Sequence, residues 1–215
     1  MMAPALPFLA LGDSYTIGEG VAADARWTHQ LAARLRDAGI PLADPYTIAT
    51  TGWTTGELLQ ALAAAAPQRP WALVSLLIGV NNQYRGLSLH EYQRDFAALL
   101  QQAITLADHR PDRVLALSIP DWGVTPFATA SGRDRNQIGT ELDAFNAAAH
   151  TICQQQGVAW VDITPLSRQF GADASMLAAD GLHPSAAQYS LWMQVALPTA
   201  RALLTDTAPP NATPP

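Results

Sequence analysis

A serine near the start of the chain and a histidine near its end are the residues best suited to do chemistry. Ser14 follows an apolar run, and His183 lies in the segment Asp180-Gly181-Leu182-His183-Pro184. A serine hydroxyl is a weak nucleophile until a base takes its proton, and histidine, with an unperturbed pKa of about 6.5, is a suitable base. Asp180 can orient the imidazole because it lies three residues earlier in the same turn. The sequence therefore predicts a catalytic triad of Ser14, Asp180 and His183.

An acyl transfer also needs hydrogen-bond donors for the oxyanion that develops on the substrate. The candidates are the backbone N–H of Ser14, the backbone N–H of Gly52 and the side-chain amide of Asn81. Each has a simpler interpretation as a turn residue, and Gly52 precedes Thr54-x-x-Glu57, the pattern of a helix capping box. All three residues lie in turns that follow predicted strands, and the residues alone leave both interpretations open.

Four other residues in such turns are candidates for a substrate pocket: Trp53, Asn82, Trp122 and Phe127. The aromatic side chains could line an acyl or leaving-group pocket, although packing of the loops explains them equally well. Asn82 could instead form a turn or supply a supporting hydrogen bond. Asp13 is a rival for the triad acid, and we interpret it as structural, accepting hydrogen bonds from N–H groups of its own turn.

Short apolar runs alternate with longer amphipathic stretches along the chain. This alternation predicts a single-domain three-layer α/β/α fold with a five-stranded parallel, flavodoxin-like sheet, in which turns at the carboxyl ends of the strands share one edge. Residues 120–138 are predicted to be a long connection, and 1–205 to form the domain, followed by a flexible Pro-rich tail at 206–215. The predicted strands are 6–11, 46–49, 71–78, 114–119 and 158–163, and the predicted helices are 27–38, 55–66, 88–107, 139–156 and 184–204.

Composition excludes several classes of function. All 12 basic residues are arginine, so the chain lacks the lysine that Schiff-base chemistry and a Walker P-loop require. The net charge is −6 and no basic stripe is visible, which argues against a nucleic-acid partner. No histidine pairs closely with another histidine or with Cys153, so we expect no metal and no other cofactor.

The same features bear on partners and compartment. One cysteine forbids an internal disulfide, and no apolar stretch approaches the roughly 20 residues of a membrane helix. We expect a small-molecule ester substrate and no stable membrane insertion, and the oligomeric state is open. The start of the chain lacks the basic region of a signal peptide. This predicts a cytoplasmic protein, or a periplasmic or secreted one if an upstream signal has been removed.

Taken together, four blocks of the sequence resemble the SGNH, or GDSL-like, hydrolase family: Gly-Asp-Ser at 12–14, Gly52, Gly-x-Asn at 79–81 and Asp-Gly-Leu-His-Pro at 180–184. The resemblance implies a flavodoxin-like fold and metal-free hydrolysis of carboxylic esters or thioesters. It assigns the family's four defining residues to Ser14, Gly52, Asn81 and His183, and its triad acid to Asp180. Tyr15 and Asn82 stand where many members have leucine and aspartate, so subfamily and substrate are open.

The favoured function is hydrolysis of short- or medium-chain carboxylic esters through an acyl-enzyme on Ser14. A lysophospholipase, an acyl-thioesterase or a carbohydrate acetylesterase would use the same site. A flavin-binding, flavodoxin-like protein is a distant alternative, because the hydroxyl-rich turn at 50–54 is similar to a phosphate loop at a helix start. Flavodoxins carry that loop after the first strand, whereas here it follows the second. A catalytically inactive binding domain has no support, since every expected catalytic residue is present.

Overall fold

The computed structural model describes residues 4–68 and 70–205 and contains one five-stranded parallel sheet in the order β2-β1-β3-β4-β5. The predicted flavodoxin-like α/β fold is confirmed. The strand order reverses between β1 and β3, and in such sheets the ligand crevice lies at the carboxyl ends of the strands at that reversal. The strands are β1 (Phe8–Gly12), β2 (Tyr46–Ala49), β3 (Leu73–Leu77), β4 (Val114–Leu117) and β5 (Ala159–Val161).

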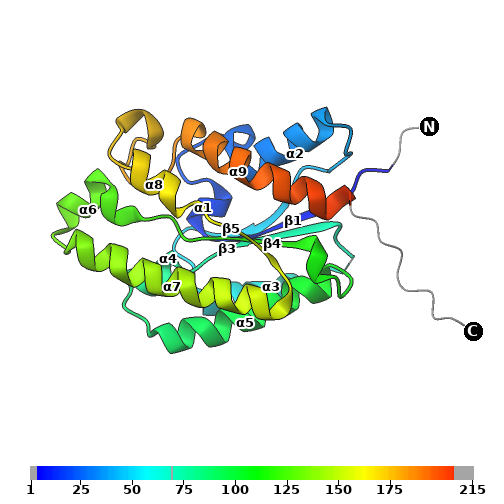
Figure 1. The fold of residues 1–215 in the computed structure, drawn as a ribbon, viewed down its shortest axis with the longest axis horizontal. Helices are drawn as coiled ribbons and strands as arrows, with labels where there is room; N and C mark the ends of the chain where they lie inside the picture. The colour runs from blue at the N-terminus through cyan, green and yellow to red at the C-terminus, as the bar shows by residue number, and fades with distance from the viewer. Residues whose placement is uncertain (1–3, 69, 206–215) are drawn as a thin grey trace, which may run out of the picture.

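Helices cover both faces of the sheet (Figure 1). One layer contains α2 (Trp27–Asp37) and α9 (Ala186–Thr205), and the other contains α3 (Thr55–Ala65), α5 (Leu89–Leu106) and α7 (Arg135–Gln156). The central strands β1 and β3 are buried along their whole length, as expected for a sheet that is covered on both sides. The helices bury apolar stripes against them, each buried large side chain contributing about 1.5–3 kcal/mol.

Short helices occupy the turns at the carboxyl ends of the strands, and the sequence did not predict them. They are α1 (Ser14–Ile17) after β1, α4 (Val80–Tyr84) after β3, α6 (Pro126–Ser131) and α8 (Thr164–Phe170). Helices of four to seven residues contain too few turns to show a helical period in the sequence. Four single-turn 3-10 segments complete the described structure: η1 (Ala23–Ala25), η2 (Pro111–Arg113), η3 (Trp122–Val124) and η4 (Ala174–Met176).

The predicted boundaries agree with the structure to within two residues except at the start of α7, and two of the differences have a clear structural cause. The connection predicted at 120–138 contains η3, α6 and the first residues of α7, which begins at Arg135 rather than Gly139 because the Asp134 side chain caps it. The last helix begins at Ala186 rather than Pro184. Pro184 pairs with Leu177 in an isolated antiparallel bridge, which keeps it out of the helix.

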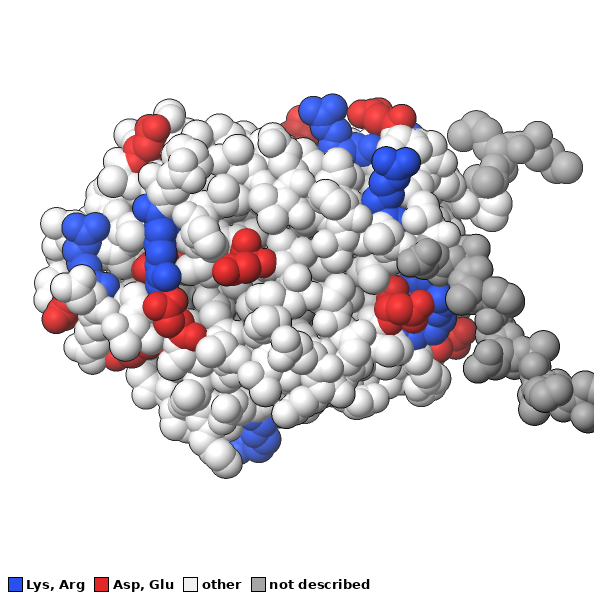
Figure 2. Space-filling view, viewed as in Figure 1, with Lys and Arg blue, Asp and Glu red and all other residues white. Residues whose placement is uncertain are grey.

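The charged side chains on the surface and the ends of the chain do not help to locate the site. On the face shown in Figure 2, arginine and acidic side chains occur in mixed groups rather than in one basic stripe. Among the described residues, no helix combines the length and apolar character needed to cross a membrane. The predicted Pro-rich tail at 206–215 lies outside the described residues, and the domain boundary at 205 stays a prediction.

Candidate active site

Ser14 is the first residue of α1, at the point where β1 ends. The Asp13 side chain accepts a hydrogen bond from the Tyr15 N–H at 3.0 Å, which confirms the predicted structural role of Asp13 in its own turn. A Cβ atom at Gly12 would overlap the Thr16 side chain and the Leu77 carbonyl oxygen, so the space here admits only glycine. Because Ser14 opens the helix, its N–H has no acceptor within the helix.

His183 and Asp180 are already paired by the local turn. The His183 Nδ1 lies 2.6 Å from Asp180 Oδ2, while Asp180 Oδ1 accepts hydrogen bonds from the backbone N–H groups of Leu182 and His183 at 2.9 and 3.0 Å. Gly181 has φ of +67°, which allows this tight bend. Partial burial acts to raise the pKa of Asp180, but these three hydrogen bonds outweigh it and hold the pKa below its usual value. The His183 Nε2 is left as the other nitrogen that can exchange a proton.

Backbone contacts also fix the position of the histidine turn. The carbonyl of His183 accepts a hydrogen bond from the Ala178 N–H at 2.7 Å, beside the bridge between Leu177 and Pro184. The Phe127 N–H at the start of α6 donates to the Gly181 carbonyl at 3.2 Å. The turn is therefore held from two sides before any substrate arrives.

Gly52 and Asn81 lie in neighbouring turns that are tied together. Gly52 has φ of +87°, in the left-handed region that favours glycine. The Asn81 side-chain amide donates to the Trp53 carbonyl at 2.9 Å, and the Arg85 guanidinium donates to the Gly52 carbonyl. A side-chain amide carries two N–H donors, so Asn81 keeps a second one for another acceptor.

These turns converge on one cavity of about 180 Å³. Its lining includes Ser14, Gly52, Asn81 and His183, while Asp180 lies behind His183. The nucleophile and base candidates are only 4% and 8% exposed, and both line this cavity. The remaining lining residues are Tyr15, Thr51, Val80, Tyr84, Trp122, Phe127 and Leu182.

The four predicted pocket residues divide into two pairs. Trp122 and Phe127 line the cavity, whereas Trp53 and Asn82 are not part of its lining. Trp53 packs against the hydrophobic core, and the buried Asn82 accepts a hydrogen bond from the Thr55 N–H at 3.0 Å and donates to Thr55 Oγ1 at 2.7 Å. Tyr84 also lines the cavity and was not predicted from the sequence. It lies three residues after Asn81, and on a helix this spacing places the two side chains on the same side.

Comparison with known proteins identifies the family. Residues 10–191 match the GDSL-like lipase/acylhydrolase family. The chain belongs to this family. It is 25% identical to Esterase TesA of Pseudomonas aeruginosa over 202 residues, which cover 94% of this chain and 91% of the relative. The family and this relative make the protein a carboxylic ester hydrolase.

Two solved structures share the fold. A crystal structure of TesA matches with a TM-score of 0.73 and 24% identity, covering 92% of this chain and 99% of that one. Axe2, an acetylxylan esterase from Geobacillus stearothermophilus, matches with a TM-score of 0.69 and 17% identity, covering 93% and 96%.

Tyr15 and Asn82, the two residues at which this GDSL-like hydrolase differs from many family members, each contact specific neighbours in the structure. The ring of Tyr15 lies between His183 and Trp192, at centroid distances of 5.7 and 5.8 Å, and its burial raises the pKa of the phenol. Asn82 donates a hydrogen bond to the Thr55 hydroxyl, which a carboxylate could not do.

The hydrolase site also contains a buried acid beside the nucleophile. Burial raises the pKa of Asp13 to about 7, although backbone N–H groups, including that of Tyr15, act to lower it. Within the described part of the chain, no three histidine, cysteine, aspartate or glutamate residues cluster closely enough to hold a metal ion. The residues at the cavity supply a hydroxyl, an imidazole–carboxylate pair and N–H donors, which are the groups that acyl transfer requires.

Proposed function

We propose that the protein hydrolyses short- or medium-chain carboxylic esters through an acyl-enzyme on Ser14. The observation that carries the proposal is the convergence of Ser14, Gly52, Asn81 and His183 on one cavity, with Asp180 2.6 Å from the far side of the imidazole. Esterase TesA, which covers nearly the whole chain, supports the reaction class.

In the proposed reaction, His183 Nε2 takes the Ser14 hydroxyl proton as the serine oxygen attacks the ester carbonyl. The tetrahedral intermediate collapses, the bond to the alcohol oxygen breaks, and the imidazolium protonates the departing alcohol. Water then enters, gives a proton to His183 and attacks the acyl-enzyme; as this second intermediate collapses, the bond to the serine oxygen breaks, the imidazolium protonates that oxygen, and the acid leaves. The Asp180 carboxylate keeps a proton on Nδ1 and stabilises the imidazolium in both halves.

The oxyanion in both tetrahedral intermediates would lie among three donors: the N–H of Ser14, the N–H of Gly52 and the second N–H of the Asn81 amide. The contacts of Asn81 with Trp53 and of Arg85 with Gly52 hold two of these donors in place before the substrate binds. Preorganised donors of this kind need no rearrangement when the charge develops, which is the basis of their large effect on rate.

The size and lining of the cavity favour a short acyl group. An engineered cavity of about 150 Å³ in another protein holds benzene, a ligand of six carbon atoms. The cavity here, at about 180 Å³, is slightly larger, and beyond the catalytic groups its walls are mainly apolar or aromatic. A short acyl group fits this space without movement of the walls.

The turn at residues 50–54 gives no support to the flavin alternative. The Thr51 hydroxyl donates to the Glu19 carboxylate, which places a negative charge where a cofactor phosphate would have to bind. In the same turn, the Trp53 carbonyl accepts a hydrogen bond from Asn81, and Thr54 and Glu57 pair with each other in a capping box. The family assignment likewise favours the hydrolase.

The test compares wild type and Ser14→Ala on p-nitrophenyl esters from acetyl to decanoyl. We expect Ser14→Ala to lose at least about 10³ in kcat, because removal of a triad nucleophile can cost up to about 10⁶. Ser190→Ala, on α9 and outside the cavity lining, is the matched control and should retain wild-type activity. Equal rates in wild type and Ser14→Ala would refute the acyl-enzyme. Parallel assays with thioesters and acetylated sugars distinguish the alternative substrates.

A further inference from the structure

The wall of the cavity formed by Trp122 is held by one buried side chain. The indole Nε1–H of Trp122 donates a hydrogen bond to Gln83 Oε1 at 2.8 Å, and both residues are only 2% exposed. An indole N–H can only donate, so the carbonyl oxygen of the glutamine must face it. The orientation of Gln83 is thus fixed by chemistry as well as by packing.

The other end of Gln83 is equally constrained. Its Nε2 donates to Glu141 Oε2 on α7 at 2.6 Å, and a carboxylate can only accept. The Arg133 guanidinium lies 3.5 Å from the same carboxylate oxygen and 5.3 Å from the centroid of the Trp122 ring. Gln83 therefore connects the indole of the cavity wall to an ion pair outside the cavity.

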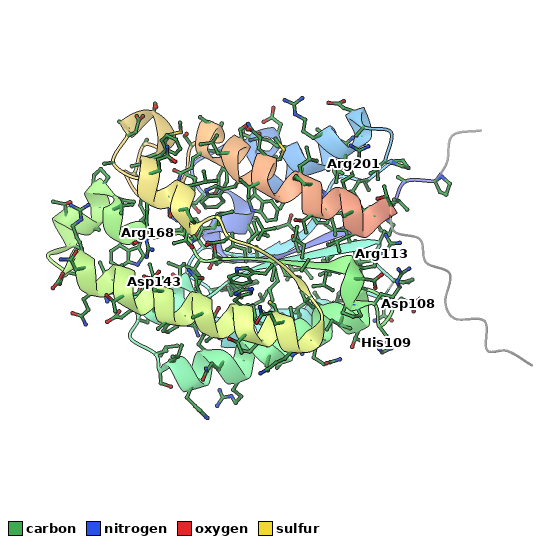
Figure 3. All side chains as sticks on the ribbon, in the orientation of Figure 1. Asp108, His109, Arg113, Asp143, Arg168 and Arg201 are labelled. Atoms are coloured by element: carbon green, nitrogen blue, oxygen red, sulfur yellow. The ribbon has the colours of Figure 1, made fainter. Side chains whose placement is uncertain are left out.

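The backbone around Trp122 is fixed independently of Gln83. Asp121 accepts a charge-assisted hydrogen bond from Arg168 on α8 at 2.9 Å, and the Arg135 side chain donates to the Gly123 carbonyl at 2.6 Å. Arg168 also donates to Asp143 on α7 at 2.7 Å, and both side chains are labelled at this end of the molecule in Figure 3. Loss of the Gln83 contact should therefore release the indole while the segment that carries it stays in place.

The geometry points to Gln83 as a determinant of acyl-chain length, acting through the position of Trp122. This inference rests on the proposed function, because it assigns the Trp122 side of the cavity to the acyl group. Gln83 is two residues after Asn81 on the same short helix α4, so the oxyanion donor and the support of this wall are carried by one element. With the indole locked, the cavity ends at Trp122, and a longer acyl chain must displace a ring that is hydrogen-bonded and buried.

Gln83→Leu tests this directly, because leucine keeps the apolar volume but cannot accept the indole N–H. We expect the ratio of kcat/KM for p-nitrophenyl octanoate to that for the acetate to rise about five- to tenfold, the scale of one lost hydrogen bond. Gln137→Leu is the matched control: Gln137 also donates to Glu141, at 2.8 Å, but it is exposed and is not part of the cavity lining. Its chain-length ratio should equal that of wild type.

A double-mutant cycle asks whether Gln83 acts through Trp122. Trp122→Phe removes the indole N–H, so adding Gln83→Leu to it should change the chain-length ratio by less than about twofold. A Gln83→Leu shift of the same size in both backgrounds would overturn the inference, as would an unchanged ratio in the single variant. Should Gln83→Leu fail to fold, Glu141→Ala, which removes the partner on α7, should shift the ratio in the same direction.

A second substrate series distinguishes the acyl side from the alcohol side. Alkyl acetates from methyl to hexyl vary the alcohol while the acyl group stays constant, and Gln83→Leu should leave their relative rates unchanged. A shift in this series in place of the acyl series would overturn the assignment of Trp122 to the acyl group. Failure of the proposed function gives a different result, since Ser14→Ala would then hydrolyse the same esters as fast as wild type.

Discussion

Asp180→Asn should remove most of the activity although it only replaces one carboxylate oxygen with an NH₂ group. Asp180 Oδ1 already accepts two backbone N–H groups, so an asparagine at this position keeps its carbonyl oxygen there. Its NH₂ group then replaces Oδ2, which lies 2.6 Å from His183 Nδ1. A donor at that place forces Nδ1 to be the acceptor and puts the ring proton on Nε2. The imidazole then cannot take the proton of Ser14.

The expected loss is about 10⁴ in kcat, the size of the same change in a serine protease triad. This corresponds to about 5.4 kcal/mol of transition-state stabilisation at 1.36 kcal/mol for each tenfold change in rate. The assay is steady-state hydrolysis of p-nitrophenyl butyrate at pH 8, with circular dichroism to confirm that the variant is folded. KM should change little, because Asp180 is not part of the cavity lining.

Asp173→Asn is the control for this prediction. Asp173 is also an exposed aspartate whose Oδ1 accepts a hydrogen bond from a backbone N–H two residues later, that of Ser175, at 2.9 Å. It has no histidine partner, so its asparagine variant should keep kcat within about twofold of wild type. The orienting role of Asp180 is refuted if Asp180→Asn retains more than about a tenth of wild-type kcat, or if both variants lose activity equally.

Three further predictions concern other residues of the site and the core. Asn81→Ala should lower kcat by about 10²–10³ with little change in KM, and steady-state kinetics showing a loss confined to KM would contradict the oxyanion role. The pKa of Asp13 is raised to about 7, so its contribution to stability is present below pH 4 and is lost as the pH rises through 7. In urea unfolding, the free energy of unfolding of Asp13→Asn should therefore increase relative to that of wild type between pH 4 and pH 8. A constant difference over this range would contradict the prediction. Burial raises the pKa of Cys153 to about 12, so a disulfide reagent at pH 8 should label the thiol only after unfolding, and rapid labelling of native protein would exclude this burial.

The strands and long helices were predictable because their signals are local and repeated. The run Leu73–Leu77 is apolar at every position but Ser75 and is a central strand, and Ser88 with Glu91 marks the start of α5. The contact between Asp180 and His183 was predictable for a related reason: the two residues lie three positions apart, and the geometry of one turn brings them together. The start of the last helix was wrong because a tertiary contact decides it: Pro184 pairs with Leu177, which is outside the turn. The start of α7 was wrong although its signal, the Asp134 cap, is local.

The supports of the cavity could not be predicted, because each depends on an encounter between segments far apart in the sequence. Nothing near Gln83 indicates that it accepts the indole N–H of Trp122, and nothing near Arg85 indicates that it binds the Gly52 carbonyl. Asn82 was a candidate for the pocket because it lies in a turn that follows a predicted strand. Its two hydrogen bonds to Thr55 instead tie α4 to the start of α3.

The conformation of residues 80–84 explains why one short segment serves so many functions. As an extended turn it would send alternate side chains to two opposite sides, but as a helix it turns each successive residue by about 100°. Asn81 therefore reaches the Trp53 carbonyl and the cavity, Asn82 reaches Thr55, and Gln83 reaches Trp122 and α7. A change that unwinds this helix should disturb the oxyanion donor and the chain-length limit together, whereas Gln83→Leu should separate them by changing the chain-length ratio while the activity on acetate remains.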